Sequence, residues 1–238
     1  MNREPSLFRV DRLDLSFAPK PWAFADERRP EIDAYFTKLQ SENVAIWNGR
    51  VLLLYSQTVA NGVFRGAFLE TDYASFAAWG HWGWPAAAGV HDCFGAAAVQ
   101  SSDGAFLLGR MAPHTKNAGH IYFPAGTPDP SDIIDGKVDL DFSVRREFKE
   151  ETGLDAAEFE AEPGWTTVVD HGRIVQIMTL RSKQNAEVLR RRIVEQLARE
   201  QRPEFSEIRI VRGPADFDPA MPRFVTAFLA QRFAAAAD

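Results

Sequence analysis

The sequence predicts an α/β (α+β) protein, in which an α/β/α sandwich with a mixed sheet follows a smaller α+β unit. Strand and helix patterns alternate through the second half of the chain, as expected for a sheet covered by helices on both faces. A content of 45% hydrophobic and 25% charged residues is ordinary for a globular protein with a buried core. Because 238 residues exceed one standard domain, we expect an amino-terminal domain over 1–88 and a second domain over 89–238.

Turn and capping residues define the first unit. Pro19, Pro21 and Pro30 indicate an irregular or extended start, and Pro30 suits the first turn of a helix. Asn61-Gly62 is a strong hairpin signal, and Asp72 is a good N-cap residue. The expected elements are a helix at 30–39, strands at 44–57 and 63–69, and a short helix at 73–79.

The second unit begins after the Gly- and Trp-rich connection at 80–89. Ser102-Asp103-Gly104 and His171-Gly172 each separate two apolar runs, which is typical of hairpins. The expected strands lie at 94–100, 105–110, 121–123, 166–169, 174–180 and 208–211. The expected helices lie at 139–152, 186–200 and 222–233.

The helix at 139–152 carries an apolar stripe and an acidic stripe. At about 100° per residue, carboxylates on one stripe repel one another unless a cation or water compensates them. Mg²⁺ prefers such oxygen ligands. An exposed helix with interleaved charges is the alternative. The apolar stripe comprises Leu140, Val144 and Phe148, and the acidic stripe comprises Glu147, Glu150 and Glu151.

Residues Arg146 to Leu154 fit R-E-U-x-E-E-x-G-U, with U apolar, and so resemble the second half of the Nudix box. The first half, G-x5-E-x7, fits less well, because Gly126 lies twenty positions before Arg146 instead of fourteen. Val138 occupies the position of the first Glu. We therefore expect an insertion of roughly six residues within 128–137, forming a surface loop, and expect Asp139 to replace that Glu.

The resemblance implies metal-dependent hydrolysis of a nucleoside diphosphate linked to a further moiety. Mg²⁺ or Mn²⁺ would neutralise charge on the phosphoryl oxygens. The metal ligands implied are Glu147, Glu150 and Glu151, with Asp139 as a fourth candidate, and Arg146 would orient a carboxylate. A general base could come from the helix or from a loop. Glu204, in the loop before the last strand, is the loop candidate, with Glu207 second.

Cationic and amide side chains precede the acidic helix, where they could hold phosphate or ribose. Arg110, Asn117 and His120 are the candidates for substrate binding, whereas Lys116 is expected to be solvated. Two amino-terminal segments, 47–49 and 69–73, resemble the domain that precedes the Nudix domain in eukaryotic UDP-glucose/UDP-galactose diphosphatases. This resemblance favours a nucleoside diphosphate sugar as substrate. ADP-ribose and dinucleoside polyphosphates are alternative substrates, and a catalytically inactive nucleotide-binding or protein-interaction module is the alternative function.

Composition limits the possible partners and compartments of the protein. The formal net charge of −6 argues against a nucleic-acid partner. The sequence has no apolar run long enough to span a membrane and no signal peptide at its start. A single cysteine, Cys93, excludes an internal disulfide. The expected compartment is the cytoplasm and the expected partner a small nucleotide, while the oligomeric state stays open, a homodimer included.

Overall fold

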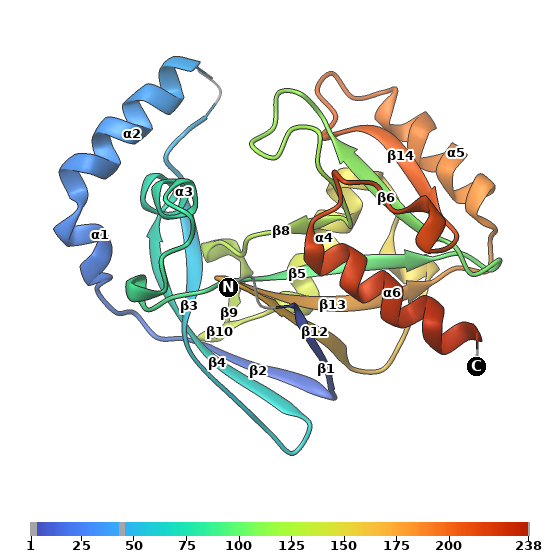
Figure 1. Ribbon diagram of the computed structural model, residues 1–238, viewed down its shortest axis with the longest axis horizontal. Helices are drawn as coiled ribbons and strands as arrows, with labels where there is room; N and C mark the ends of the chain where they lie inside the picture. The colour runs from blue at the N-terminus through green and yellow to red at the C-terminus, as the bar shows by residue number, and fades with distance from the viewer. Residues whose placement is uncertain (1–3, 43–45, 238) are drawn as a thin grey trace.

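A computed structural model of the protein describes residues 4–42 and 46–237 (Figure 1). Within these residues the chain forms a larger and a smaller mixed sheet. The larger sheet has the strand order β1-β12-β13-β5-β6-β14, and β13 and β5 are parallel at its centre. These strands are β1 (Ser6–Val10), β12 (Trp165–Asp170), β13 (Arg173–Arg181), β5 (Asp92–Gln100), β6 (Phe106–Met111) and β14 (Phe205–Val211), with the short strands β7 (Ile121–Tyr122), β8 (Ala125–Gly126) and β11 (Glu160–Ala161) alongside.

Helices cover both faces of the larger sheet. They are α4 (Leu140–Thr152), α5 (Ala186–Leu197) and α6 (Arg223–Ala237). Successive β5 residues point to opposite faces: Cys93 and Ala97 share a core with α4 and α5, whereas Phe94 and Ala98 pack in the core that contains α6. The α/β/α sandwich predicted from the sequence is thereby confirmed.

The smaller sheet belongs mainly to the amino-terminal unit. Its strands are β3 (Arg50–Ala60), β4 (Val63–Asp72), β2 (Arg12–Phe17), β10 (Lys137–Val138) and β9 (Ile133–Ile134), and its helices are α1 (Ala23–Glu27), α2 (Arg29–Glu42) and α3 (Tyr73–His81). Asn61 and Gly62 both have positive φ, which confirms the predicted hairpin. The strand expected from Val44 begins at Arg50, and residues 43–45 lie outside the described residues.

The first unit shares its core with the second. Along β3, Val51 and Leu53 pack in the cluster that contains α2 and α3, while Leu52 and Leu54 join the cluster that contains α4. In Figure 1 the helices α1, α2 and α3 accordingly lie on the side of the smaller sheet that faces away from α4. The amino-terminal unit is therefore packed against the sandwich over a whole sheet face.

The two units also exchange strands. Strand β1 pairs with β12 of the larger sheet over five residue pairs, from Ser6 with Val169 to Val10 with Trp165. In return, β10 pairs with β2 through Lys137 and Ser16. The expected division at residue 88 is thus crossed in both directions.

The expectation of a surface loop over 128–137 is wrong. This segment includes a 3-10 turn and most of the β9–β10 pair, and Leu52 N donates a hydrogen bond to Pro128 O at 2.8 Å. Lys137 forms an ion pair with Asp14 of β2 at 3.1 Å. The inserted residues therefore attach the acidic helix to the smaller sheet, because their backbone completes its edge.

None of the described helices is long and apolar enough to cross a membrane.

Candidate active site

Helix α4 is held tightly on β5. Leu140, Val144 and Phe148 are buried, as predicted from the helical period. A Cβ on Gly95 of β5 would lie 2.2 Å from Val144 Cγ2, so only glycine allows this approach. The helix ends at Gly153, which has a φ of 71° and supplies the left-handed cap predicted from the sequence. This packing fixes which side chains α4 presents along its other face.

Glu151 is the most deeply placed of the helix carboxylates. It is 3% exposed, and its Oε2 accepts a hydrogen bond from Ala125 N at 2.9 Å. Burial raises the pKa of Glu151 well above its usual value, and the neighbouring carboxylates of Glu204 and Glu147 raise it further. A buried carboxyl with such neighbours is a strong site for a cation.

Glu147 lies beside the same backbone segment. A Cβ on Gly126 would stand 2.4 Å from Glu147 Cδ, so the carboxyl group rests directly on the glycine. Burial raises the pKa of Glu147 to about 7, although the charge of Arg146 opposes this shift. Glu147 and Glu151 therefore meet along the strand formed by Ala125 and Gly126.

Glu204 belongs to this cluster although it lies far from Glu147 and Glu151 in the sequence. It directly precedes β14, and its carbonyl accepts a hydrogen bond from Ala112 N at 2.7 Å. Its carboxylate raises the pKa of both Glu151 and Glu147, and it shares a side-chain hydrogen bond with Glu151. The loop candidate predicted from the sequence is thus brought together with two of the helix carboxylates.

Glu150 occupies a more open position. Its side chain is 59% exposed, and its Oε2 accepts a hydrogen bond from Arg146 Nη1 at 3.4 Å. It lies at the rim of the cluster, one turn along the helix from Arg146.

Arg146 is anchored by a residue that the sequence analysis missed. Its Nη2 donates to both carboxylate oxygens of Asp132 at 3.1 and 3.2 Å, and its Nη1 lies 2.8 Å from Glu147 Oε1. Asp132 is fully buried and also accepts from Ser143 Oγ at 3.1 Å and from Asp129 N at 3.0 Å. It follows Gly126 by six positions, as the first Glu of the box pattern does, and this spacing was the available signal.

Asp139 does not take the place of that first Glu. It is the N-cap of α4, where its carboxylate accepts a hydrogen bond from Phe142 N at 3.0 Å. Eight residues of helix separate it from Glu147, which corresponds to about 12 Å along the axis. In this structure the carboxylate of Asp139 is therefore engaged at the helix cap and does not belong to the cluster of Glu147 and Glu151.

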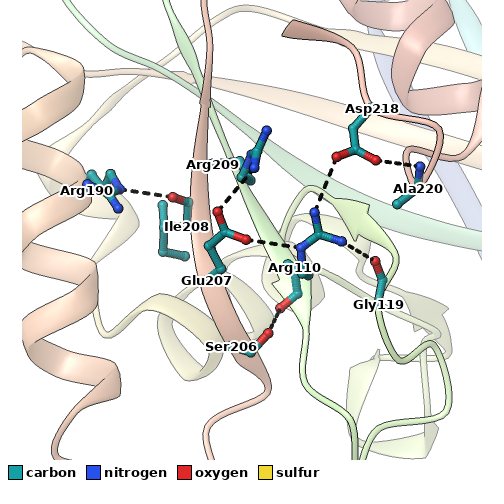
Figure 2. A network of polar contacts seen from close by, with 9 residues as sticks. All are labelled: Arg110, Gly119, Arg190, Ser206, Glu207, Ile208, Arg209, Asp218 and Ala220. Atoms are coloured by element: carbon teal, nitrogen blue, oxygen red, sulfur yellow. Dashed lines mark hydrogen bonds and ion pairs between the residues drawn. The ribbon is translucent and has the colours of Figure 1, made fainter.

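Arg110 is also turned away from the acidic cluster. Figure 2 shows its guanidinium between Glu207, Asp218 and the carbonyl of Gly119, at 3.1, 3.3 and 3.0 Å respectively. These contacts hold β6, β14 and two connecting loops together. Glu207 is paired with Arg110 and Arg209, and neither Arg110 nor Glu207 is among the described residues that line the cavity below.

A cavity of about 640 Å³ lies beside the cluster. Ala125 and Gly126, which contact the helix carboxylates, form part of its wall, and so do the predicted substrate-binding residues Asn117 and His120. The volume is that of a site for a nucleotide-sized ligand. The remaining lining comes from both units and includes Val51, Tyr73, Phe76, Trp84, Asp92, Phe94, Lys116, Tyr122, Thr127, Asp170, Arg173 and residues 219–224.

The amino-terminal segments that resemble UDP-sugar diphosphatases shape this wall. Asn48 Oδ1 accepts a hydrogen bond from Ala74 N at 2.8 Å, and Tyr73 N donates to Gly49 O at 2.8 Å. Asp72 caps α3 by accepting from Ser75 N at 2.9 Å. These bonds fix the start of α3, and thereby the position of Tyr73 at the cavity.

The donor set suits a hard divalent cation. As they stand, no three His, Cys, Asp or Glu side chains of the described residues are arranged to hold a metal ion. The carboxylate of Glu204 nevertheless raises the pKa of Glu147 and of Glu151, and Glu147 raises that of Glu151, so a cation is favoured among these side chains. Oxygen ligands of this kind fit Mg²⁺ or Mn²⁺, whose charge would relieve the repulsion.

Comparison with known proteins gives matches among solved structures. No model of a known protein family matches the chain, and no curated protein matches it either. The MutT protein from Methanosarcina mazei Go1 is 18% identical, with a TM-score of 0.41, over 62% of this chain and 96% of that one. The NUDIX domain of Shewanella oneidensis NrtR, solved with ADP ribose, is 17% identical, with a TM-score of 0.39, over 68% and 98% of the two chains.

A third match is RenU, a Nudix hydrolase from M. smegmatis, which is 16% identical, with a TM-score of 0.37, over 62% of this chain and 86% of that one. All three matches are at most 18% identical to this chain.

Proposed function

We propose that this protein is a Nudix-type diphosphatase that hydrolyses a nucleoside diphosphate sugar to a nucleoside monophosphate and a sugar phosphate. The observation that carries the proposal is the cluster of Glu147, Glu151 and Glu204 beside a nucleotide-sized cavity, in which Glu151 is buried and Glu147 partly buried. Carboxylates with a raised pKa in such a cluster are typical of functional sites.

Each residue of the cluster has a separate role in this proposal. Glu147 and Glu151, with Glu150 at the rim, would hold Mg²⁺ or Mn²⁺. The bound cation supplies positive charge for the phosphoryl oxygens. Arg146, fixed by Asp132, keeps the carboxylate of Glu147 in place. Glu204, on its own loop, would accept the proton of the attacking water at its carboxylate.

The sugar substrate is favoured by the structural role of the amino-terminal segments. Segments 47–49 and 69–73 are the ones that resemble UDP-sugar diphosphatases, and hydrogen bonds made by them position Tyr73 at the cavity. The proposal therefore takes UDP-glucose and UDP-galactose as the first substrates to test, with ADP-ribose and dinucleoside polyphosphates beside them.

The test combines a substrate screen with charge-neutral variants. With Mg²⁺ or Mn²⁺, wild-type protein should release a monophosphate from at least one substrate. Glu147→Gln and Glu151→Gln should each lower kcat by about a thousandfold or more, because each removes a carboxylate that holds the metal charge. In chelator near neutral pH, the same variants should melt at a higher temperature than wild type, because a glutamate that ionises in the unfolded chain must lose or bury its charge on folding, whereas glutamine is always neutral.

Glu195→Gln is the matched control, since Glu195 is exposed on α5. It should leave both turnover and melting temperature unchanged. Wild-type turnover in Glu147→Gln and Glu151→Gln would exclude this cluster as the active site. Binding of nucleotides without hydrolysis of any of them would instead favour the inactive nucleotide-binding module.

A further inference from the structure

The cavity has a cationic end that the proposed hydrolytic chemistry does not use. Lys116, from the loop between β6 and β7, and Arg173, at the start of β13, both line it. Asp92, at the start of β5, is 5% exposed and lies between them: its carboxylate is 3.9 Å from Arg173 Nε and 3.5 Å from Thr127 Oγ1. Two cations thus surround one carboxylate, which leaves a net positive charge at this end.

Both cations rest on aromatic rings of the amino-terminal unit. The ammonium of Lys116 lies 4.3 Å from the ring centre of Phe76 and 5.1 Å from that of Tyr73, both on α3. The guanidinium of Arg173 lies 4.9 Å from the ring centre of Trp84, which follows α3. A ring face attracts a cation without occupying its N–H groups, so these donors stay free to bind a ligand in the cavity.

Lys116 is in contact with the solvent of the cavity but is enclosed by its walls. Lys116 is exposed, yet desolvation by the surrounding protein lowers its pKa to about 8. The charge of Asp92 opposes this shift, and the charge of Arg173 adds to it. The sequence-based expectation of an ordinary solvated lysine therefore describes its exposure but not its surroundings. A lysine desolvated beside a second cation gains from a nearby anion.

We propose that Lys116 and Arg173 form an anion subsite for a phosphoryl group of the ligand, and that the amino-terminal unit creates this subsite by holding both cations on its aromatic rings. The inference rests on the proposed function in taking a nucleotide as the ligand. The acidic cluster lies beside the cavity, whereas Lys116 and Arg173 are part of its wall. In the metal-free protein, the phosphoryl oxygens of a diphosphate compound are repelled by the carboxylates and attracted by Lys116 and Arg173.

Pyrophosphate in metal-free buffer is the probe, measured by isothermal titration calorimetry on the full chain. Lys116→Gln and Arg173→Gln should each weaken binding by about tenfold, as expected for loss of a charge-assisted hydrogen bond. Lys116→Arg should retain most of the affinity. Phe76→Leu keeps an apolar side chain but removes the ring face, and should weaken binding several-fold while the melting temperature reports its effect on folding.

Two controls separate this subsite from the hydrolytic site. Lys183→Gln removes the same charge from an exposed turn and should leave binding unchanged. Glu151→Gln should abolish hydrolysis yet leave pyrophosphate affinity equal or higher. If hydrolysis fails in every substrate while pyrophosphate binding still depends on Lys116, the subsite stands without the proposed function.

With a hydrolysed substrate in hand, Lys116→Gln should lower kcat/KM, because the subsite binds one of the two phosphoryl groups that the reacting bond joins. Wild-type pyrophosphate affinity and kcat/KM in both Lys116→Gln and Arg173→Gln would overturn the subsite and leave the hydrolytic cluster unaffected.

Discussion

Asp132 shows how one buried charge organises the residues around it. It is fully buried, and it accepts hydrogen bonds from Arg146, Ser143 and Asp129 N. A buried carboxylate is costly unless it is paired and hydrogen-bonded, and here each requirement is met by α4 or by the turn before it. The position of the Arg146 guanidinium, and with it the orientation of Glu147, therefore depends on Asp132.

We expect Asp132→Asn to lower the free energy of unfolding by about 3 kcal/mol, because it leaves Arg146 without its buried counter-charge. The value lies at the lower end for buried pairs, since Arg146 is 23% exposed and keeps Glu147 as a partner. Urea denaturation followed by circular dichroism measures it. Asp135→Asn, in the exposed turn between β9 and β10, is the control and should change little. Equal stability of the two variants would show that the pair contributes no net stabilisation.

At the residue scale, local sequence patterns predicted those features of α4 that depend on the helix alone. The helical period gave the burial of Leu140, Val144 and Phe148, and the position of Gly153 as the cap. It did not predict Asp132 as the partner of Arg146, because the expected position was counted back from Arg146 across the inserted residues, whereas Asp132 keeps its spacing from Gly126. Arg110 was misplaced for another reason: its chain position lies near the site, but pairing with Glu207 and Asp218 turns its side chain elsewhere.

Helix α4 depends on glycines for its contacts with neighbouring elements. Gly95 admits the helix to β5, and Gly153 lies against α5, where an added Cβ would stand 2.1 Å from Gln196 Cγ. The acidic face is thus positioned by two backbone approaches as well as by apolar packing.

Gly153→Ala should destabilise the protein by more than the roughly 1–2 kcal/mol expected for a left-handed alanine, because the new methyl group also meets Gln196. Gly136→Ala is a matched control: Gly136 has a φ of 75°, and an added Cβ there has no neighbour within 4 Å among the described residues. The difference between the two variants in thermal or urea denaturation measures the contact between α4 and α5. Equal losses would mean that Gln196 moves aside at no cost.

At the element scale, the sequence predicted most helices and strands of both units, since hairpin turns, caps and periodicity are local signals. The inserted segment was misjudged, because two-residue strands such as β9 and β10 have too few residues to show a period. Their structure depends on β2, more than a hundred residues earlier, and such pairing leaves no local trace.

At the scale of the whole molecule, the two units are joined by exchanged strands and by the cavity between them. Strand β1 covers the edge of β12, and α3 supplies ring faces to Lys116. The amino-terminal unit is accordingly part of the sandwich edge and of the cavity wall at once.

Removal of residues 1–11 should expose the backbone groups of β12 as a free sheet edge, which favours association between copies. We expect a lower melting temperature and larger species in size-exclusion chromatography. Removal of residues 1–4 leaves β1 intact and serves as the control. A stable, monodisperse protein after the longer truncation would show that β1 is dispensable to the sandwich.

The pairing of β1 with β12 also determines when the protein can finish folding during its synthesis. Ser6 is synthesised before its partner Val169, which follows it more than a hundred and fifty residues later in the sequence. Until then β1 has no strand to join, although β2, which follows it directly, can already pair with β4. Contacts so distant in sequence form slowly, because a long loop must close first. The larger sheet is therefore completed late, once β12 has been made and can pair with β1.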